Sequence, residues 1–522
     1  MDNPAQKTTR HINPKTGKVY IYSVESYWDK TKKAPRNRQR LIGSLDPVSG
    51  AFIPRKPKPA PGEKAMAGVT AQCHVVGPAL LLEKLTADLE LATLLRKCFP
   101  NDAERILCAV YFIVQKGLPL SHCETWCVNH RHPHEGILSS QEISKLLDVI
   151  TEADRQRFFS FWLKKISGRE YLCYDITSVS SYSEGNEYIK YGYNRDHENL
   201  PQLNLAMLYG QQSHRPAYYR RMPGNISDVS TLKTTIRSLD FLEGGKMHFV
   251  LDRGFYSKGN VDDMFRTRNN FTMALPSGLR WVEAALDKYL DTIQTPEHYL
   301  ELNDRESLFA ATELMYWPDL NRRCYLHIYY NAFKAATDFD DLTNRLIRWK
   351  GELETNQPVP EHKDIYERFF KVSETPKRGR RVTYNAQAIR SYRNKYAGFF
   401  CILSVNIRSA EQALECYRNR EAVENSFDDL KNQLDMKRLR VHTAGRMDSR
   451  IFLQFLALIY INEIRTTMQA DKILKNLTVR ELMEVLEPLT RITYSHRYGR
   501  LHSEMNKEQR HVFEVFGLQL PT

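Results

Sequence analysis

The sequence lacks a long apolar run, an internal repeat and an ordered set of cysteines. Its longest apolar run, IFLQFLALIYI at 451–461, falls short of the ~20 residues that a membrane-spanning helix needs, so it predicts a buried helix. The nine cysteines are odd in number and scattered, which argues against a disulfide framework and for a reducing compartment. The first residues, MDNPAQKTTRH, have no apolar segment of the signal-peptide kind. We therefore expect an intracellular protein with no membrane segment.

Acidic residues are also too few to balance the basic ones. The 522 residues include 75 Lys and Arg against 62 Asp and Glu, which gives a net charge of +13. Residues 1–64 hold 14 basic against 5 acidic residues, and residues 371–395 hold 8 against 1. Separate basic patches in one chain favour an extended polyanion as partner, most often nucleic acid. A basic protein without such a partner is the alternative that charge alone leaves open.

The length predicts several domains rather than one core. Residues 18–43 predict a basic strand hairpin, and PRKPKPAPGEK at 54–64 a Pro-rich linker. Apolar residues then follow helical spacing from about 66 to 168. The expected domains are a hairpin with its linker, a helical domain, a catalytic core in two parts around an insertion, and a helical C-terminal region; their ranges are 1–65, 66–168, 169–269 with 395–450, 270–394 and 451–522.

Strands and helices alternate in the middle of the chain. YLCYDITSVSSYS (171–183), QLNLAMLYG (202–210) and PAYYRRMPG (216–224) read as strands, and a helix follows. MHFVLDRGF (247–255) is a short apolar strand, and YAGFFCILSVN (396–406) another. This order predicts a mixed α/β sheet with helices packed on it.

Two aspartates and one helix carry the candidate chemistry. Asp175 lies within a predicted strand and Asp252 at the carboxyl end of another, where α/β sheets place ligands. On an unbroken α-helix of about 100° per residue, four polar residues of YRNREAVENSFDDLK (417–431) fall within an arc of about 60° beside an apolar stripe. They are Tyr417, Arg420, Glu424 and Lys431. A salt-bridged solvent face is the common explanation of such a stripe, but two strand aspartates and a helix glutamate also form an oxygen ligand set suited to Mg²⁺.

These segments, in this order, resemble insertion-sequence transposases of the DDE class. DITSVSSYS, YGYNRDHENLPQLNLAMLYG, MPGNISD, VLDRGFY and YRNREAVENSFDDLK carry the resemblance, which runs from about 20 to 465. The last segment matches a Tyr-x2-Arg-x3-Glu-x6-Lys signature without deviation. The resemblance implies a multidomain α/β protein. Its ribonuclease H-like mixed-sheet core would be interrupted by an insertion domain and flanked by a helical N-terminal region and a helical C-terminal tail.

The resemblance also implies roles for individual residues. Asp175, Asp252 and Glu424 would be the catalytic, metal-binding triad, holding two Mg²⁺ ions that Mn²⁺ can replace. Arg420 and Lys431 would hold phosphates of the transposon end, and Tyr417 would bond the backbone near the cleaved strand. The implied partners are double-stranded DNA, as transposon ends and target, and a second subunit in a dimer on DNA. The implied location is the bacterial or archaeal cytoplasm, at the nucleoid when DNA is bound.

Several features of the sequence allow more than one interpretation. A stand-alone metal-dependent nuclease of the same fold, or an inactive DNA-binding relative, are the alternative functions. SHCETWCVNHRHPHEG (121–136) gathers zinc-type ligands, but its spacing matches no common motif, and a helix end with packed cysteines followed by a polar loop is the favoured explanation. Trp281 and Trp317 are candidates for base stacking or for the core, and Asp196 and His197 for a loop near the site or a polar surface.

Overall fold

The computed structural model describes most of the chain. The described residues are 7–14, 16–47, 49–55, 71–166, 170–182, 186–196, 198–241, 246–276, 278–301, 307–355, 357, 359, 362–375, 379–434, 436, 438–439, 443–495 and 499–519. The expected Pro-rich linker therefore lies largely outside the described residues, as does His197. Contacts between residues divide the chain into two compact units, Met1–Gln72 with Thr493–Arg500, and Cys73–Ile492 with Leu501–Thr522.

The first unit contains a four-stranded antiparallel sheet in the order β1-β2-β3-β4. Its strands are β1 (Thr8–Ile12), β2 (Val19–Asp29), β3 (Ala34–Leu45) and β4 (Phe52–Pro54). The turn between β2 and β3 is closed by the Asp29 carboxylate, which accepts bonds from the backbone N–H groups of Thr31 and Lys32. The two strands expected within 18–43 are thus confirmed, and only a few of their side chains are buried.

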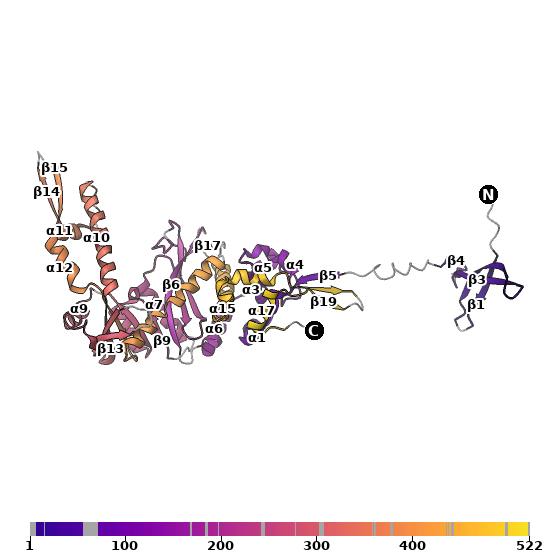
Figure 1. Cartoon of the computed structure of the whole chain (residues 1–522), viewed down its shortest axis with the longest axis horizontal. Helices are drawn as coiled ribbons and strands as arrows, with labels where there is room; N and C mark the ends of the chain where they lie inside the picture. The colour runs from indigo at the N-terminus through magenta and orange to yellow at the C-terminus, as the bar shows by residue number, and fades with distance from the viewer. Residues whose placement is uncertain are drawn as a thin grey trace. The chain divides into compact units, whose positions relative to one another are not determined.

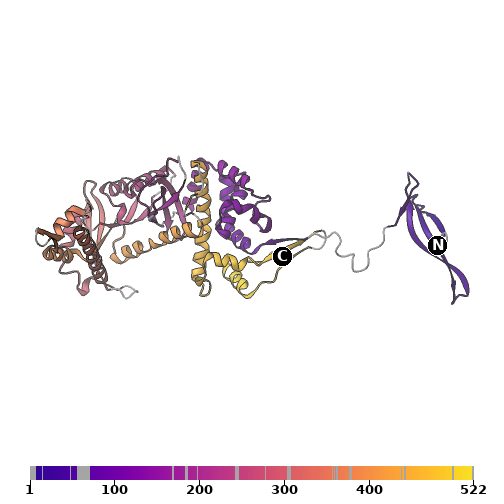
Figure 2. The ribbon, with the colours of Figure 1, turned by 90° about the horizontal axis from the view of Figure 1, so that it is seen from above.

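The second unit combines a helical region with a large sheet. The helical region contains α1 (Gly77–Asp88), α2 (Leu91–Cys98), α3 (Ala103–Lys116), η2 (Leu120–His122), α4 (Cys123–Asn129), α5 (Ser140–Val149), α6 (Glu152–Ile166), α15 (Ala444–Ala470), η7 (Leu474–Asn476), α16 (Val479–Leu486) and α17 (Lys507–Phe516). Short strands accompany it: β5 (Ala71–Val75), β18 (Thr490–Tyr494) and β19 (Arg500–His502). The long helix α15 packs on α3 and α5 along one side and on β8 along the other (Figures 1 and 2). It contains the run 451–461, which is buried as expected.

The large sheet has the order β11-β12-β13-β16-β10-β9-β6-β7-β8, with β17 paired to β6. Its strands are β6 (Tyr171–Ser181), β7 (Gln202–Gly210), β8 (Pro216–Pro223), β9 (His248–Leu251), β10 (Asn270–Leu275), β11 (Tyr299–Glu301), β12 (Ser307–Trp317), β13 (Arg322–Asn331), β16 (Phe399–Ser404) and β17 (Arg438–Leu439). β6 pairs in parallel with β9, and β9 with β10, whereas β7 and β16 run antiparallel to their neighbours. Every residue of β7 is buried because this strand is covered on both faces. The mixed α/β architecture is as predicted.

Helices α7 (Asp228–Phe241) and α8 (Lys258–Arg266) follow β8 and β9 in the chain, with η3 (Arg253–Phe255) directly after β9. The segment between β10 and β16 has two parts. Its strands β11 to β13 extend the main sheet, with α9 (Arg280–Leu286) and η4 (Pro296–His298) before them. Beyond them, α10 (Ala332–Glu354), α11 (Lys363–Phe369), β14 (Phe370–Thr375), β15 (Gly379–Tyr384) and α12 (Ala386–Tyr396) surround a small core of their own. The β14–β15 hairpin projects away from the main sheet (Figure 1).

In the described part of the chain, no single helix is long and apolar enough to cross a membrane. One pair of helices, Ala103–Lys116 with Leu120–Asn129, meets the length and composition only together and is bent by 104° between them.

A buried histidine in the sheet predicts a pH-dependent stability. Burial lowers the pKa of His327 in β13 from 6.5 to about 4. The Ser404 hydroxyl donates to the Ile407 carbonyl, so Nε2 of His327 donates to Ser404 Oγ and Nδ1 is left to accept from Thr312. The unfolded chain takes up the proton first as the pH falls, and native stability is lost from pH 6.5 downwards. The loss should reach about 3 kcal/mol near pH 4.

Urea unfolding of the wild type and of His327→Gln at several pH values measures this term. The stability difference between the two proteins should shrink as the pH falls from 6.5 to 4. His122→Gln changes an exposed histidine and provides the control. A stability difference that stays constant over this range would show that His327 does not titrate as burial requires.

Candidate active site

The two predicted strand aspartates each follow the same registered residue pair of two neighbouring strands. β6 and β9 pair in parallel, and their last registered pair is Tyr174 with Leu251. The next residue of each strand is Asp175 and Asp252. Both aspartates thus follow one registered pair directly, at the carboxyl end of β9. Asp252 stands just beyond the end of β9 with an extended backbone, at the carboxyl edge where it was expected.

The third carboxylate comes from the helix that covers these strands. α13 (Ala410–Arg418) packs against β9 and β10, and α14 (Glu421–Asp428) against β6 and β7. The Tyr417 hydroxyl donates to Asp252 Oδ1 at 2.7 Å. The helical segment and the strand ends are therefore tied directly at the site.

Arg420 connects two members of the predicted triad. One guanidinium nitrogen lies 2.8 Å from Glu424 Oε1, and the other lies 3.7 Å from Asp175 Oδ2. Its Nε is buried and has no hydrogen-bond partner among the described residues. The guanidinium thus lies between the two carboxylates, and its bonding capacity is not used up.

The segment 417–431 is not one unbroken α-helix, so the 60° arc predicted for it is wrong. Bonds from Arg420 N to Tyr417 O, from Ala422 N to Asn419 O, and from Val423 N to Arg420 O span three residues, which tightens the turn between α13 and α14. A π-helical turn, Asp429–Gln433, then follows α14. Each of these changes alters the residue angle from 100°. The four side chains meet their partners through these local turns, not along one straight stripe.

Lys431 is held by a partner that the sequence did not single out for it. Its Nζ contacts both oxygens of Asp196 at 2.7 and 2.8 Å, and its side chain is largely buried. Asp196 therefore approaches the site from its loop, one of the two alternatives left open above. Next to it, Arg195 forms a two-pronged bond, both distances 2.7 Å, with Asp228 at the start of α7. Its charge also acts on Asp175. Sequence reasoning missed Arg195, whose only signal was its place in the quoted segment YGYNRDH.

The negative charges of the site are only partly neutralised by the neighbouring cationic side chains. Burial raises the pKa of Asp175 to about 6, and Glu424 adds to the rise, although Arg420 and Arg195 oppose it. Burial and the neighbouring Asp252 charge raise the pKa of the Tyr417 phenol, so the phenol stays protonated and donates. Three carboxylates face one inserted guanidinium, and a further cation would relieve the excess charge.

The residues present fit a divalent metal by chemistry. Carboxylate oxygens are the ligands that Mg²⁺ takes, and desolvation of Asp175 favours a bound cation beside it. The three carboxylates do not close on a single point, however. Within the described residues, the one group of three or more metal-binding side chains whose ligand atoms all lie within 4.8 Å of one another is elsewhere in the chain. Arg420 lies between Asp175 and Glu424, and the charge of Asp252 also acts on it.

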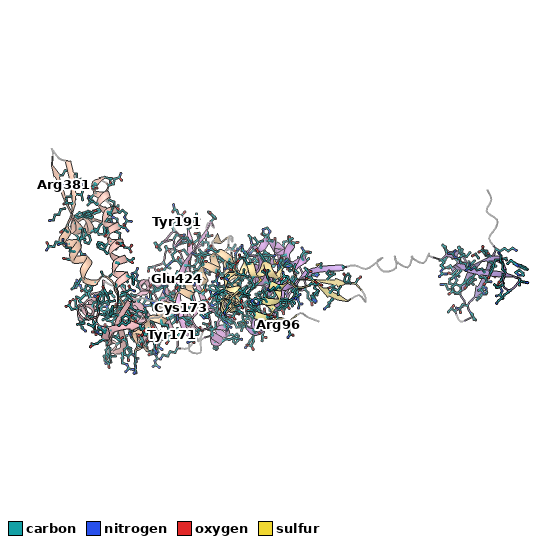
Figure 3. All side chains as sticks on the ribbon, in the orientation of Figure 1. Arg96, Tyr171, Cys173, Tyr191, Arg381 and Glu424 are labelled. Atoms are coloured by element: carbon teal, nitrogen blue, oxygen red, sulfur yellow. The ribbon has the colours of Figure 1, made fainter. Side chains whose placement is uncertain are left out.

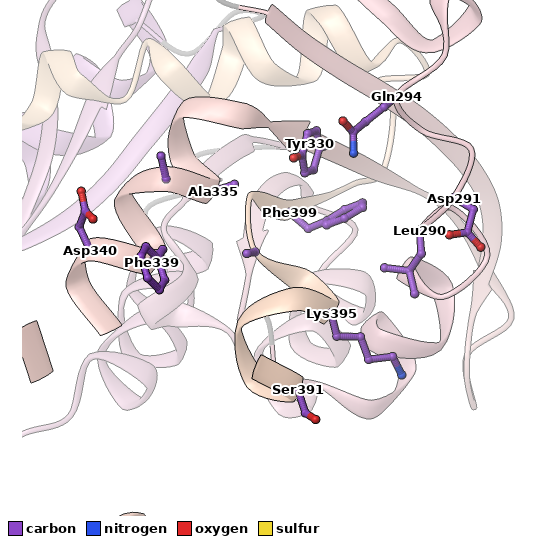
Figure 4. A pocket seen from close by; sticks show the side chains of 12 residues that line it. Leu290, Asp291, Gln294, Tyr330, Ala335, Phe339, Asp340, Ser391, Lys395 and Phe399 are labelled. Atoms are coloured by element: carbon purple, nitrogen blue, oxygen red, sulfur yellow. The ribbon is translucent and has the colours of Figure 1, made fainter. Parts of the chain in front are cut away.

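Two other candidates lie apart from the carboxylates. Trp317 is buried, donates to Asp262 Oδ1 at 2.6 Å and packs edge-on against Trp281, which itself donates to the Tyr256 hydroxyl. These contacts support the core explanation for both tryptophans. A cleft of about 730 Å³ opens between α10, α12 and the loop after α9 (Figure 4). Its lining includes Asp291 and Lys395 but none of the triad.

Comparison with known proteins identifies the family of the chain. The sequence matches the family described as "Transposase DDE domain" over residues 166–460, which include Asp175, Asp252 and Glu424. No curated protein matches the chain. One solved structure, "Cryo-EM structure of piggyBac transposase synaptic complex with hairpin DNA", is similar at 10% identity and a TM-score of 0.37, covering 79% of each chain. Because the family match spans more than half of the sequence, the chain belongs to the DDE-domain transposases, a family of divalent-metal-dependent enzymes that cut and transfer DNA.

Proposed function

We propose that the protein is an insertion-sequence transposase. It binds the terminal inverted repeats of its element, cleaves DNA at the element ends and transfers the 3′ ends to target DNA by direct attack, without a covalent protein–DNA intermediate. The observation that carries this proposal is the position of Asp175 in β6 and of Asp252 directly after β9, its parallel neighbour, with Glu424 joined to Asp175 through Arg420.

The proposed core is ribonuclease H-like. Its support is the strand order β8-β7-β6-β9-β10, antiparallel from β8 to β6 and parallel from β6 to β10. On this assignment the segment between β10 and β16 is the insertion. The expected boundary at 270 then shifts to the end of β10, because that strand is a central member of the sheet. The helical region would recognise the element ends.

The proposed metal ligands are the three carboxylates. Two bound Mg²⁺ ions would activate the attacking water or 3′-hydroxyl and stabilise the leaving oxygen. Asp252 is held in orientation by the Tyr417 hydroxyl. Arg420 lies between Asp175 and Glu424, and Lys431 pairs with Asp196; both cations would contact phosphates of the element end. Such contacts position DNA without reading its sequence.

DNA as partner is supported by the charge of the chain. The β14–β15 hairpin carries part of the basic segment 371–395, and Arg381 lies exposed on it (Figure 3). Phosphate contacts by such residues release counterions and give much of the binding free energy. Two element ends are joined in one event, so we propose a dimer on DNA.

Two observations test the proposal: the DNA sequence that flanks the gene, and the cleavage activity of the purified protein. Terminal inverted repeats with short direct repeats outside them should flank the coding sequence. With Mg²⁺, purified protein should cut a duplex ending in that repeat at the element's 3′ end and join it to a second duplex; a scrambled repeat is the control. Chelation should stop cutting while DNA binding persists. Cutting that ignores the repeat and never joins ends would indicate the stand-alone nuclease instead.

Arg420→Ala should weaken DNA binding and flatten its dependence on salt. If Arg420 neutralises one phosphate, the slope of log K against log salt should fall by about 0.9. Fluorescence anisotropy with a repeat-ended duplex at several salt concentrations measures both. Arg266→Ala removes an exposed arginine of α8 that pairs with Asp263, and it should leave the slope unchanged. Equal slopes for Arg420→Ala and wild type would remove Arg420 from the DNA interface.

A further inference from the structure

Three thiols converge in the helical region, far from the carboxylates in sequence. Cys108 comes from α3, and Cys123 and Cys127 lie one turn apart on α4. All three side chains are buried. The sulfur of Cys127 is 3.7 Å from that of Cys108 and 3.8 Å from that of Cys123, and all three sulfurs lie within 4.8 Å of one another.

These spacings are those of a tetrahedral metal site. Zinc binds thiolate sulfur at about 2.3 Å, so two sulfurs at neighbouring corners of a tetrahedron are ~3.8 Å apart. The two measured separations match this edge. Soft sulfur ligands select zinc over the hard cations that suit carboxylates.

His132 is the candidate for the fourth position. Its ring lies beside the cluster, although its nitrogens are not among the atoms that lie within 4.8 Å of one another. Nε2 lies 3.2 Å from the Cys127 carbonyl oxygen, to which it donates, and the ring packs against Trp126 with centroids 5.6 Å apart. Nδ1 is then the bare nitrogen. It is buried and has no hydrogen-bond partner among the described residues, an arrangement that fits a ligand whose other nitrogen is fixed by a carbonyl.

The neighbouring histidines have other surroundings. His130 is fully engaged, with Nδ1 2.9 Å from the Trp126 carbonyl and Nε2 2.8 Å from Glu487 Oε1. His122 is exposed. Of His122, His130 and His132, only His132 both bonds to the Cys127 carbonyl and has a buried ring nitrogen without a partner among the described residues.

We propose that Cys108, Cys123, Cys127 and His132 bind one structural Zn²⁺ ion. The set is closed, with four protein ligands and no open position for a substrate, so its role is to hold α3, α4 and the following loop together. Its binding free energy then adds to the stability of the helical region. The alternatives are three thiols packed as small apolar groups, and an oxidised pair.

Elemental analysis of protein purified without chelators tests the site. We expect one zinc per chain, lost in Cys108→Ser, Cys123→Ser and Cys127→Ser and bound more weakly in His132→Ala. Cys401→Ser changes a buried cysteine of β16 and should keep its zinc. Stoichiometric zinc in the triple-serine variant would overturn the proposal.

A second measurement does not depend on the variants folding. Wild-type protein stripped of metal and loaded with Co²⁺ should show the strong visible bands of a tetrahedral thiolate site and a sulfur-to-metal charge-transfer band. Zn²⁺ should abolish both by displacement. Absence of these bands at equimolar Co²⁺ in folded protein would overturn the proposal. So would a disulfide between two of the three cysteines in freshly purified, metal-free protein.

Discussion

Asp175→Asn, Asp252→Asn and Glu424→Gln are each expected to reduce cleavage of a repeat-ended duplex by at least about a thousandfold. Metal ions supply several kcal/mol of charge stabilisation to phosphoryl transfer, and about 1.4 kcal/mol corresponds to a tenfold change in rate. Each substitution keeps the shape of the side chain but replaces a ligand oxygen by an amide nitrogen. Single-turnover cleavage with excess enzyme measures the effect on the chemical step.

Glu421→Gln is the matched control for this series. Glu421 lies in the first turn of α14 and is exposed, as is Glu424, but it has no place in the proposed triad. Cleavage by this variant should equal that of the wild type. DNA binding by the three triad variants should persist, because their lost charge is negative. Cleavage by Glu424→Gln at the wild-type rate would show that the helix glutamate is not a catalytic ligand.

Asp448→Ala is expected to lower the free energy of unfolding of the second unit by about 3–5 kcal/mol. Asp448 lies in α15 and is bonded by Arg155 of α6 at 3.2 Å and by Arg221 of β8 at 2.8 Å. Arg155 and Asp448 are both buried, and burial raises the pKa of Asp448 despite its two cationic partners. Removal of the carboxylate leaves two desolvated guanidinium groups without their shared anion. Urea unfolding, followed by tryptophan fluorescence, measures the loss.

An exposed ion pair on the same helix provides the comparison. Arg446, two residues before Asp448, pairs with Asp148 of α5 at 2.7 Å, and both side chains are largely exposed. Exposed pairs contribute little because water screens them, so Asp148→Ala should leave the unfolding midpoint nearly unchanged. Equal midpoints for Asp448→Ala and Asp148→Ala would show that the buried network does not join the helices to the sheet.

Local sequence patterns were sufficient to predict the strands and the positions of the aspartates. β6, β7 and β9 are runs of β-branched, aromatic and apolar residues, and such runs form strands wherever both faces are covered. The placement of Asp252 after the last apolar residue of β9 followed from the same pattern. The family signature then identified Glu424 as the third carboxylate.

The rest depended on tertiary contacts that no local pattern contains. A helix period assumes constant geometry, but the bonds spanning three residues at 419–423 and the π-turn at Asp429–Gln433 break that period. Lys431 contacts Asp196, which is far from it in the sequence. Cys108 likewise contacts thiols of α4, outside its own helix. The third thiol was overlooked for that reason: its distance from the 121–136 cluster matches no local motif.

Anomalous diffraction from Mn²⁺ in crystals of the protein bound to a repeat-ended duplex tests the central claim most directly. The claim is that Asp175, Asp252 and Glu424 together hold the metal ions that act on the element end. We predict anomalous peaks within bonding distance of all three carboxylates. Ordered DNA at the site with no anomalous peak beside Asp175 would contradict the account.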